Sequence, residues 1–307
     1  MPRIAYVDGA YLPHADAAVH IEDRGNQFAD AVYEVWAVRA GGLLDMPGHL
    51  KRLRRSLGEL HIAVPMSDDA LTLVLHEIVR RNRLRDGLVY LQVSRGVAPR
   101  DHAFPSPAVS PTVIVTAKRT DMKTAEAKAE KGISVITLPD IRWGRRDIKT
   151  VSLLPNALAK QAAKETGAGE AWLIDPDGTI TEGSSSNAWI LTPDNVLVTR
   201  AASNSILNGI TRLAVIEAAS GEKLRVEERA FTRDEALAAK EAFVTSASAH
   251  VTAVVAIDGQ KIGDGRPGAV AKALRTAYLT AVRQNSVALH KREAGPLVAR
   301  RTKRRIP

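Results

Sequence analysis

A lysine and a glutamate stand out as residues that could take part in covalent and acid–base chemistry. Lys149 lies in the segment Asp147-Ile148-Lys149-Thr150, ahead of a stretch with helix-forming composition. Glu182 lies further along the chain, in the polar segment T-E-G-S-S-S-N at residues 181–187. A lysine amine can serve as a nucleophile and as a base. Taken singly, a lone lysine is usually a surface cation and a Gly-Ser run is usually a loop, so each segment by itself leaves the chemistry open.

Several other chemistries lack the residues that they need. Gly167 and Gly169 begin a G-x-G pattern, but Trp172 stands where a dinucleotide-binding fingerprint requires its third glycine. The chain has no G-x-x-x-x-G-K-[ST] phosphate loop, no G-x-S-x-G elbow around residues 184–186 and no cysteine. Its eight histidines are scattered, and His76-Glu77 lacks the second histidine of a zinc-binding helix. The sequence therefore favours a lysine-centred site over a metal site, a serine hydrolase or a Rossmann oxidoreductase.

Together, D-I-K-T and T-E-G-S-S-S-N resemble the signature of the fold-type IV pyridoxal-phosphate enzymes, most of all the D-amino-acid transaminases. Three further blocks are similar to that family and occur in the family's order: EDRGNQFADAVYEV at residues 22–35, HLKRL at 49–53 and LNGITR at 207–212. The resemblance extends from about residue 3 to residue 285. It implies an α+β fold of two domains and the cofactor pyridoxal 5′-phosphate (PLP).

The resemblance also implies a role for each matching residue. Lys149 would hold the cofactor as a Schiff base and move the proton at the substrate Cα, and Glu182 would face the pyridine nitrogen. The phosphate group would be held by an arginine fork, by the start of a helix and by a later turn. The residues that match these phosphate positions are Arg52, Ile210, Thr211, Ser246 and Ala247. Ala247 replaces a threonine of the family pattern, so that hydroxyl contact is absent here.

The substrate-binding residues follow from a loop that is similar to that of the D-amino-acid transaminases. Arg100 and His102 match the R-x-H pattern that, in that subfamily, reaches across a homodimer to bind the substrate α-carboxylate. Tyr33 matches a phenol that assists them, and Tyr90 matches a pocket position. The resemblance thus implies transfer of an amino group from a D-amino acid, such as D-alanine, to 2-oxoglutarate by a ping-pong mechanism.

Two alternatives remain within the fold, and three positions besides Ala247 depart from its pattern. A branched-chain L-amino-acid or amine transaminase, or an aminodeoxychorismate lyase, would carry the same cofactor motifs. Ala29 and Ala31 stand where the family often has glycine, and His250 stands where it often has glutamate. These departures concern the shape of the pocket rather than the cofactor.

Local patterns predict the elements that position these residues. A hairpin over residues 3–12 turns at Asp8-Gly9, and further strands are predicted over 32–39, 88–95, 112–118, 133–138 and 171–174, near 180 and 243, and over 251–257. Leucines at 50, 53, 57 and 60 predict a helix with one buried stripe, and Ser67 predicts the cap of another. Later helices are expected over 154–166, 211–220 and 269–284. We expect a small N-terminal α+β domain (1–118), a linker (119–131), a larger cofactor-binding domain (132–288) and a disordered basic tail (289–307).

Composition sets the remaining expectations. The chain has 307 residues, 45% of them hydrophobic and 25% charged, as in an ordinary globular protein. Residues 291–307 contribute +6 of the net charge of +9, so a basic nucleic-acid-binding protein is the rival from another class. That tail lacks the interleaved aromatic residues of single-strand binders, and we expect no nucleic-acid partner. Without an apolar leader or span, we expect a cytoplasmic protein that meets no membrane. The family resemblance implies a homodimer that acts on small amino and oxo acids.

Overall fold

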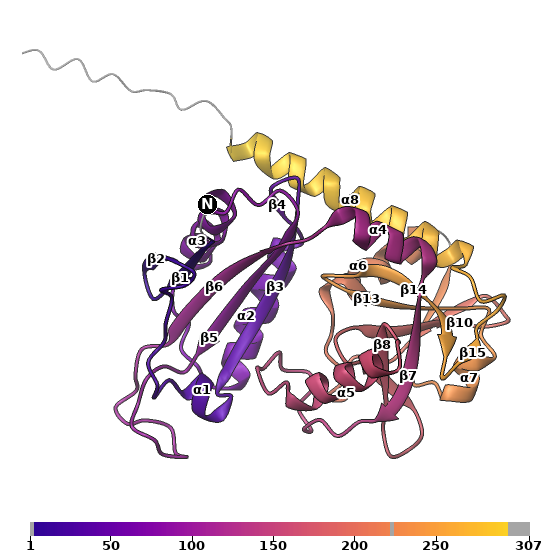
Figure 1. Ribbon diagram of the computed structural model, residues 1–307, viewed down its shortest axis with the longest axis horizontal. Coiled ribbons are helices and arrows are strands. Elements are labelled where there is room, and N and C mark those ends of the chain that lie inside the picture. The colour runs from indigo at the N-terminus through magenta and orange to yellow at the C-terminus, as the bar shows by residue number, and fades with distance from the viewer. Residues whose placement is uncertain (1–2, 222–223, 294–307) are drawn as a thin grey trace, which may run out of the picture.

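The computed structural model describes residues 3–221 and 224–293, which build two β-sheets with helices packed against them (Figure 1). The first sheet has six strands in the order β2-β1-β6-β5-β3-β4. Its strands are β1 (Ile4–Val7), β2 (Ala10–Pro13), β3 (Ala31–Arg39), β4 (Gly42–Leu43), β5 (Gly87–Ser94) and β6 (Thr112–Arg119). All their pairings are antiparallel. The predicted hairpin over 3–12 is β1 and β2.

Two helices cover one face of this sheet. They are α2 (Met46–Glu59) and α3 (Asp68–Arg81), and the short α1 (Arg24–Phe28) precedes β3. Leu53 and Leu57 of the predicted stripe are buried in the core beside Trp36, while Leu50 and Leu60 pack against its edge. Ser67 caps α3 as predicted, since its side chain accepts a hydrogen bond from the Ala70 N–H at 3.2 Å.

The second sheet is mixed and has nine strands, eight of them in the order β12-β11-β10-β13-β14-β7-β8-β9, with β15 paired to β14. The strands are β7 (Ile133–Pro139), β8 (Glu170–Ile174), β9 (Ile180–Gly183), β10 (Asn187–Leu191), β11 (Val196–Thr199), β12 (Arg225–Glu228), β13 (Glu241–Ser246), β14 (His250–Ile257) and β15 (Gln260–Lys261). The sheet packs with α5 (Leu154–Glu165), α6 (Ile210–Gly221), α7 (Arg233–Leu237) and α8 (Ala269–Glu293). The expected α+β fold is confirmed.

Strands β10, β11, β12 and β15 were missing from the sequence prediction. All five residues of β10 are buried, because Trp189 packs on the α6 side of the sheet and Ile190 on the other. A strand that is covered on both faces has no polar alternation for sequence reasoning to detect.

Two segments contain more helix than the sequence predicted. The segment predicted as a linker contains helix α4 (Met122–Lys131), which begins at the cap residue Asp121 and connects β6 of the first sheet to β7 of the second. Helix α8 extends to Glu293 and thus includes the first part of the predicted tail. Residues 284–293 contain neither glycine nor proline, so the helix has no breaker until Gly295-Pro296. The rest of the tail, 294–307, lies outside the described residues.

Helix α8 runs across both sheets (Figure 1). It contacts β13 and β14 of the second sheet and β4 of the first. The Tyr278 hydroxyl of α8 donates a hydrogen bond to Asp45, next to α2, at 2.8 Å. This helix therefore joins the two halves on the side opposite to α1 and α5. In the part of the chain that the structure describes, no helix is long and apolar enough to cross a membrane.

Candidate active site

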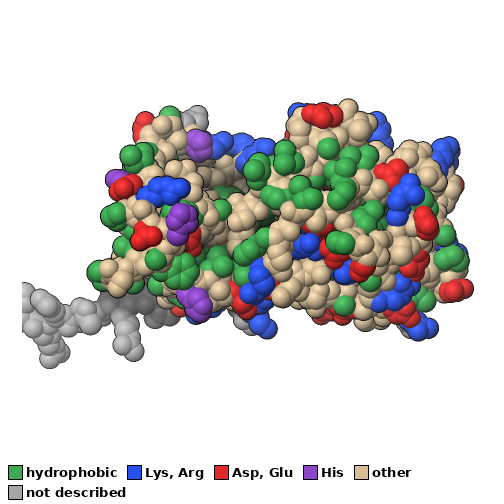
Figure 2. All heavy atoms as spheres, turned by 90° about the horizontal axis from the view of Figure 1, so that it is seen from below, with side chains coloured by type: hydrophobic (Ala, Val, Ile, Leu, Met, Phe, Trp, Pro, Cys, Tyr) green, Lys and Arg blue, Asp and Glu red, His purple; other side chains and the backbone are tan. Residues whose placement is uncertain are grey.

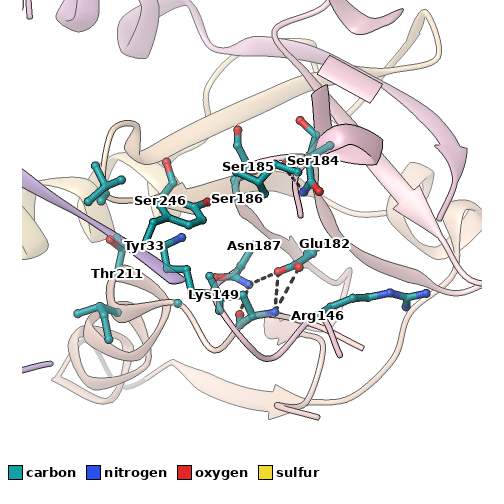
Figure 3. Close-up of a pocket in the computed structure, with 18 of the residues that line it drawn as sticks. Tyr33, Arg146, Lys149, Glu182, Ser184, Ser185, Ser186, Asn187, Thr211 and Ser246 are labelled. Atoms are coloured by element: carbon teal, nitrogen blue, oxygen red, sulfur yellow. Dashed lines mark hydrogen bonds between the residues drawn. The ribbon is translucent and has the colours of Figure 1, made fainter. Parts of the chain in front are cut away.

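A cavity of about 290 Å³ lies where the two sheets meet, and residues from distant parts of the sequence line it (Figure 3). Eight of the eleven residues singled out in the sequence lie on its walls: Tyr33, Arg52, Lys149, Glu182, Ile210, Thr211, Ser246 and Ala247. They come from β3, α2, β9, the start of α6, the end of β13 and connecting loops. The structure thus brings together one lysine, one carboxylate and one arginine fork around a single hollow.

The segment that carries Lys149 is held against the first sheet. The Lys149 carbonyl oxygen accepts a hydrogen bond from the Tyr33 N–H at 2.9 Å, and Thr150 forms a β-bridge with Val32. The Lys149 Nζ lies 4.1 Å from the centre of the Tyr33 ring, and the side chain points into the cavity. Within the described residues, no carboxylate forms an ion pair with this amine. Lys149 is therefore available to a bound molecule.

Glu182 is buried at the end of β9 and is surrounded by donors. It accepts hydrogen bonds from Arg142 Nη1 at 2.5 Å, Asn187 Nδ2 at 3.0 Å and the Leu207 N–H at 3.1 Å. Burial raises the pKa of the Glu182 carboxyl, and the neighbouring Arg142 guanidinium opposes this rise. Arg142 and Asn187 are residues that sequence reasoning missed, although Asn187 ends the T-E-G-S-S-S-N motif.

The buried carboxylate of Glu34 fixes the orientation of the Arg52 guanidinium group. Glu34 accepts two hydrogen bonds from Arg52, Nε to Oε1 and Nη2 to Oε2, both at 2.8 Å, and it contacts His49 Nδ1 at 2.7 Å. The remaining Arg52 nitrogen, Nη1, donates to the Asn208 carbonyl at 3.2 Å, just before α6 begins. Glu34 and His49 were not named as site residues, yet both lie in the matched blocks 22–35 and 49–53.

These contacts predict an acid-sensitive contribution to stability. Burial alone would raise the pKa of Glu34, but the Arg52 guanidinium and the His49 hydrogen bond lower it to about 2, against 4.5 for a free glutamate. A lowered folded-state pKa stabilises the fold above the unfolded-state pKa, and this stabilisation is lost as the pH falls through the folded-state value. We therefore expect Glu34 to contribute about 3 kcal/mol at neutral pH, lost between roughly pH 4.5 and pH 2.

Urea unfolding of the wild type and of Glu34→Gln across this pH range measures the contribution. The two unfolding free energies should converge as the pH falls. Glu77→Gln is the matched control: hydrogen bonds from Arg80 and Arg81 also lower the pKa of Glu77 to about 2, but the pair lies at the surface. Solvent screening should make its effect much smaller. If the difference in unfolding free energy between the wild type and Glu34→Gln stays constant from pH 7 to pH 2, the prediction is contradicted.

The start of α6 and the turn after β13 complete the wall near Arg52. Gly209 precedes Ile210, and a Cβ at this glycine would lie 2.1 Å from Asn187 Oδ1, so only glycine allows this close approach. The first N–H groups of a helix have no acceptor within the helix and favour an anion. In the turn, the Ser246 hydroxyl accepts from the Ala249 N–H at 3.1 Å, while Ala247 offers backbone groups only.

The three other predicted residues do not line this cavity. Tyr90 stacks on Tyr33 with ring centres 5.6 Å apart and donates its hydroxyl proton to Gln92 at 2.8 Å. Arg100 and His102 are exposed on the loop after β5, where both pack near Phe28, at 4.8 Å and 5.4 Å from its ring centre. Within one chain, the R-x-H loop and Lys149 are therefore separate.

The residues around the cavity fit a phosphorylated aromatic aldehyde such as PLP. Arg52 and the N-terminus of α6 provide donors for a phosphate, Glu182 provides a buried carboxylate for a ring nitrogen, and Lys149 provides an amine for the aldehyde carbon. The residues thus match the phosphate, the ring nitrogen and the aldehyde of that cofactor.

A family model and several known proteins match the chain. The model of amino-transferase class IV matches residues 31–257. The chain belongs to this family. It is therefore a pyridoxal-phosphate-dependent aminotransferase of fold type IV.

Relatives and solved structures match over most of the chain. D-alanine aminotransferase of Bacillus licheniformis is 43% identical over 280 residues, which cover 91% of this chain and 95% of that protein. The Staphylococcus haemolyticus enzyme of the same name is 38% identical over 274 residues, 89% of this chain and 95% of its own length. Among solved structures, a T.th. branched-chain amino acid aminotransferase with pyridoxamine 5′-phosphate has a TM-score of 0.83 at 30% identity, and the match covers 92% of this chain and 94% of that one.

Proposed function

We propose that this aminotransferase moves an amino group from a D-amino acid, such as D-alanine, to 2-oxoglutarate by a ping-pong mechanism. The observation that carries the proposal is the convergence of Lys149, Glu182 and Arg52 on one cavity. The choice of a D-amino acid is supported by the relatives named D-alanine aminotransferase, of 35–43% identity over 89–92% of the chain.

In this proposal, Lys149 is the catalytic residue. When bound, PLP supplies an aldehyde carbon for the substrate amine and a ring that accepts electrons. The Lys149 Nζ, held over Tyr33, removes the proton from the substrate Cα in the first half-reaction and returns a proton to Cα in the second. The 2-oxo acid product leaves between the two half-reactions. The same lysine amine carries out the proton transfer at Cα in each of them.

The other residues bind and orient. Glu182 would hold the pyridine nitrogen of bound PLP, and Asn187 and the Leu207 N–H keep its carboxylate in place. Arg52, which Glu34 orients through Nε and Nη2, would donate to the phosphate through its remaining guanidinium N–H groups. The backbone at Ile210, Thr211, Ser246 and Ala247 supplies the remaining phosphate donors.

The proposal includes a homodimer with the active site at its interface, in the cytoplasm. Arg100 and His102 would bind the α-carboxylate in the partner's cavity, because they do not line the cavity of their own chain. Exposed apolar side chains near α5 suit a subunit contact: Ile141 is 67% exposed, Leu154 72% and Leu158 55%. Figure 2, which views the molecule from below, shows hydrophobic side chains gathered in several groups on that face.

The first experiment is to titrate the purified enzyme with D-alanine and, separately, with L-leucine while recording its visible absorbance. We expect the cofactor band to disappear with D-alanine only. A response to L-leucine alone would move the enzyme to the branched-chain transaminases, the activity that the T.th. structure carries in its name. A protein that stays colourless after PLP is added would contradict the whole proposal.

A further inference from the structure

A second cavity, of about 220 Å³, adjoins the first. The two cavities share part of their lining, namely Leu88, Ser185, Ser186, Ser246, Ala247 and Ser248. The turn at 246–248 is therefore a wall common to both. A molecule that is bound beside Lys149 and extends past this turn enters the second cavity.

The second cavity is strongly cationic. Among the described residues that line it, four carry a positive charge, Arg39, Lys128, Lys160 and Arg275, and only Glu170 is acidic. Glu170 is already paired: Lys160 lies 3.3 Å away, and the hydroxyls of Ser185 and Ser186 donate to it at 2.8 and 3.1 Å. The other three cations have no matching carboxylate in the lining.

Neither arginine donates a hydrogen bond to a carboxylate of the described residues. Arg39 Nη2 lies 3.5 Å from Nε2 of the buried His250, and its nearest carboxylates, Glu126 at 3.7 Å and Asp86 at 3.9 Å, lie beyond hydrogen-bond distance. Glu126 is also half exposed, so solvent weakens that pair. Arg275 Nη1 donates only to the backbone carbonyls of residues 249 and 251, at 3.0 and 2.8 Å.

His250 is not an anionic partner for the two arginines. Burial and the two guanidinium groups lower its pKa to about 3, so the ring is neutral. Arginine can only donate, so Nε2 is the acceptor towards Arg39 and the proton lies on Nδ1. This Nδ1 is buried and has no partner within the described residues. Within the described residues, neither arginine therefore donates a hydrogen bond to a carboxylate, although Glu126 and Asp86 lie within 4 Å of Arg39.

We propose that Arg39 and Arg275 form a subsite for the distal carboxylate of a dicarboxylic substrate, the five-carbon 2-oxo acid or its amino acid. This inference rests on the proposed function, since it places the reacting end of the substrate at Lys149. A guanidinium group binds a carboxylate through two parallel hydrogen bonds, and partial burial strengthens them. Ser248 and Ala247 present small side chains along the shared wall. With this subsite, we expect the enzyme to prefer a dicarboxylic acceptor to a monocarboxylic one.

The test compares two acceptors, 2-oxoglutarate and the monocarboxylic 2-oxobutanoate, with D-alanine as donor and chromatographic detection of the amino acid products. In Arg39→Gln and Arg275→Gln, we expect KM for 2-oxoglutarate to rise about tenfold to a hundredfold, the loss expected for one charge-assisted hydrogen bond. KM for 2-oxobutanoate should change less than about twofold, because this acceptor has no distal carboxylate. Arg80→Gln, on the exposed face of α3, is the matched control and should leave both values unchanged.

His250→Glu tests the subsite by filling it. The carboxylate that this substitution introduces would pair with Arg39 and Arg275 and occupy the subsite. KM for 2-oxoglutarate should therefore rise as in the arginine variants, although both guanidinium groups are still present and paired. Variants that raise KM for both acceptors equally, or for neither, would overturn the subsite.

Binding of glutarate by the wild type, measured by calorimetry with butyrate as the comparison, separates the two proposals. If the wild type turns over neither acceptor, the proposed function fails, yet weaker glutarate binding in Arg39→Gln would still support the subsite. Unchanged glutarate binding would overturn it. Inorganic phosphate tests whether the two arginines form a general anion site away from the substrate. If phosphate binds to the enzyme without raising KM for 2-oxoglutarate, the anion site lies outside the substrate path, and this result would contradict the proposal.

Discussion

Replacing Lys149 with alanine should abolish transamination, with kcat falling by at least about 10⁴-fold. The substitution removes both the amine that meets the cofactor aldehyde and the base at the substrate Cα. Because no ion pair with a described residue depends on the Lys149 Nζ, we expect the fold to remain intact. Steady-state rates with D-alanine and 2-oxoglutarate, together with the thermal midpoint, measure the two effects separately.

Two variants serve as comparisons for this experiment. Lys149→Arg keeps the positive charge beside Tyr33 but has no free amine, so it should be as inactive as the alanine variant. Lys164→Ala removes an exposed lysine near the end of α5 and should leave kcat unchanged. Appreciable transamination by either Lys149 variant would show that another group moves the proton.

The second large effect is expected from the R-x-H loop and depends on the partner subunit. The double substitution of Arg100 and His102 by alanine should lower kcat/KM for D-alanine by about 10²- to 10⁴-fold, because two charge-assisted hydrogen bonds to the α-carboxylate are lost. The visible absorbance band should remain, since both residues are proposed to bind the substrate carboxylate and not the cofactor. The absorbance spectrum and the initial rates report these two outcomes independently.

Mixed dimers give this prediction its decisive form. A dimer of one Lys149→Ala protomer and one Arg100→Ala/His102→Ala protomer contains one site with every residue intact if the loop acts across the interface. Such a dimer, isolated with two different affinity tags, should have about half of the wild-type activity, since one of its two symmetric sites is complete. If the loop serves its own chain, both sites are damaged, and the mixed dimer should be as inactive as its parents.

Much of the chemistry could be read from short segments of the sequence. D-I-K-T, T-E-G-S-S-S-N and H-x-x-R-L identified the family because residue types at fixed short spacings record what a cofactor requires. Eight of the eleven predicted residues do line one cavity. Local signals also predicted the hairpin β1–β2, the stripe of α2 and the cap of α3, since turns, periodicity and caps depend on neighbours in the chain.

Elements whose sequence shows no regular alternation of apolar and polar residues were harder to predict. Helix α4 has no buried residue, so it lacks an apolar stripe; its stability comes from its cap and from alanine, lysine and glutamate, which favour helix. Strand β10 is buried on both faces and α8 is longer than expected, because burial and packing decide such elements.

The sequence by itself determined the reaction class, the cofactor and the order of the motifs that serve them. Only the tertiary structure decided which side chains meet: Glu34 with Arg52, Arg142 with Glu182, and Arg39 with His250. It also placed Arg100 and His102 outside the cavity of their own chain. The physical reason is that motifs reflect short-range chemical requirements, whereas pairings between remote side chains depend on how two sheets and their helices pack.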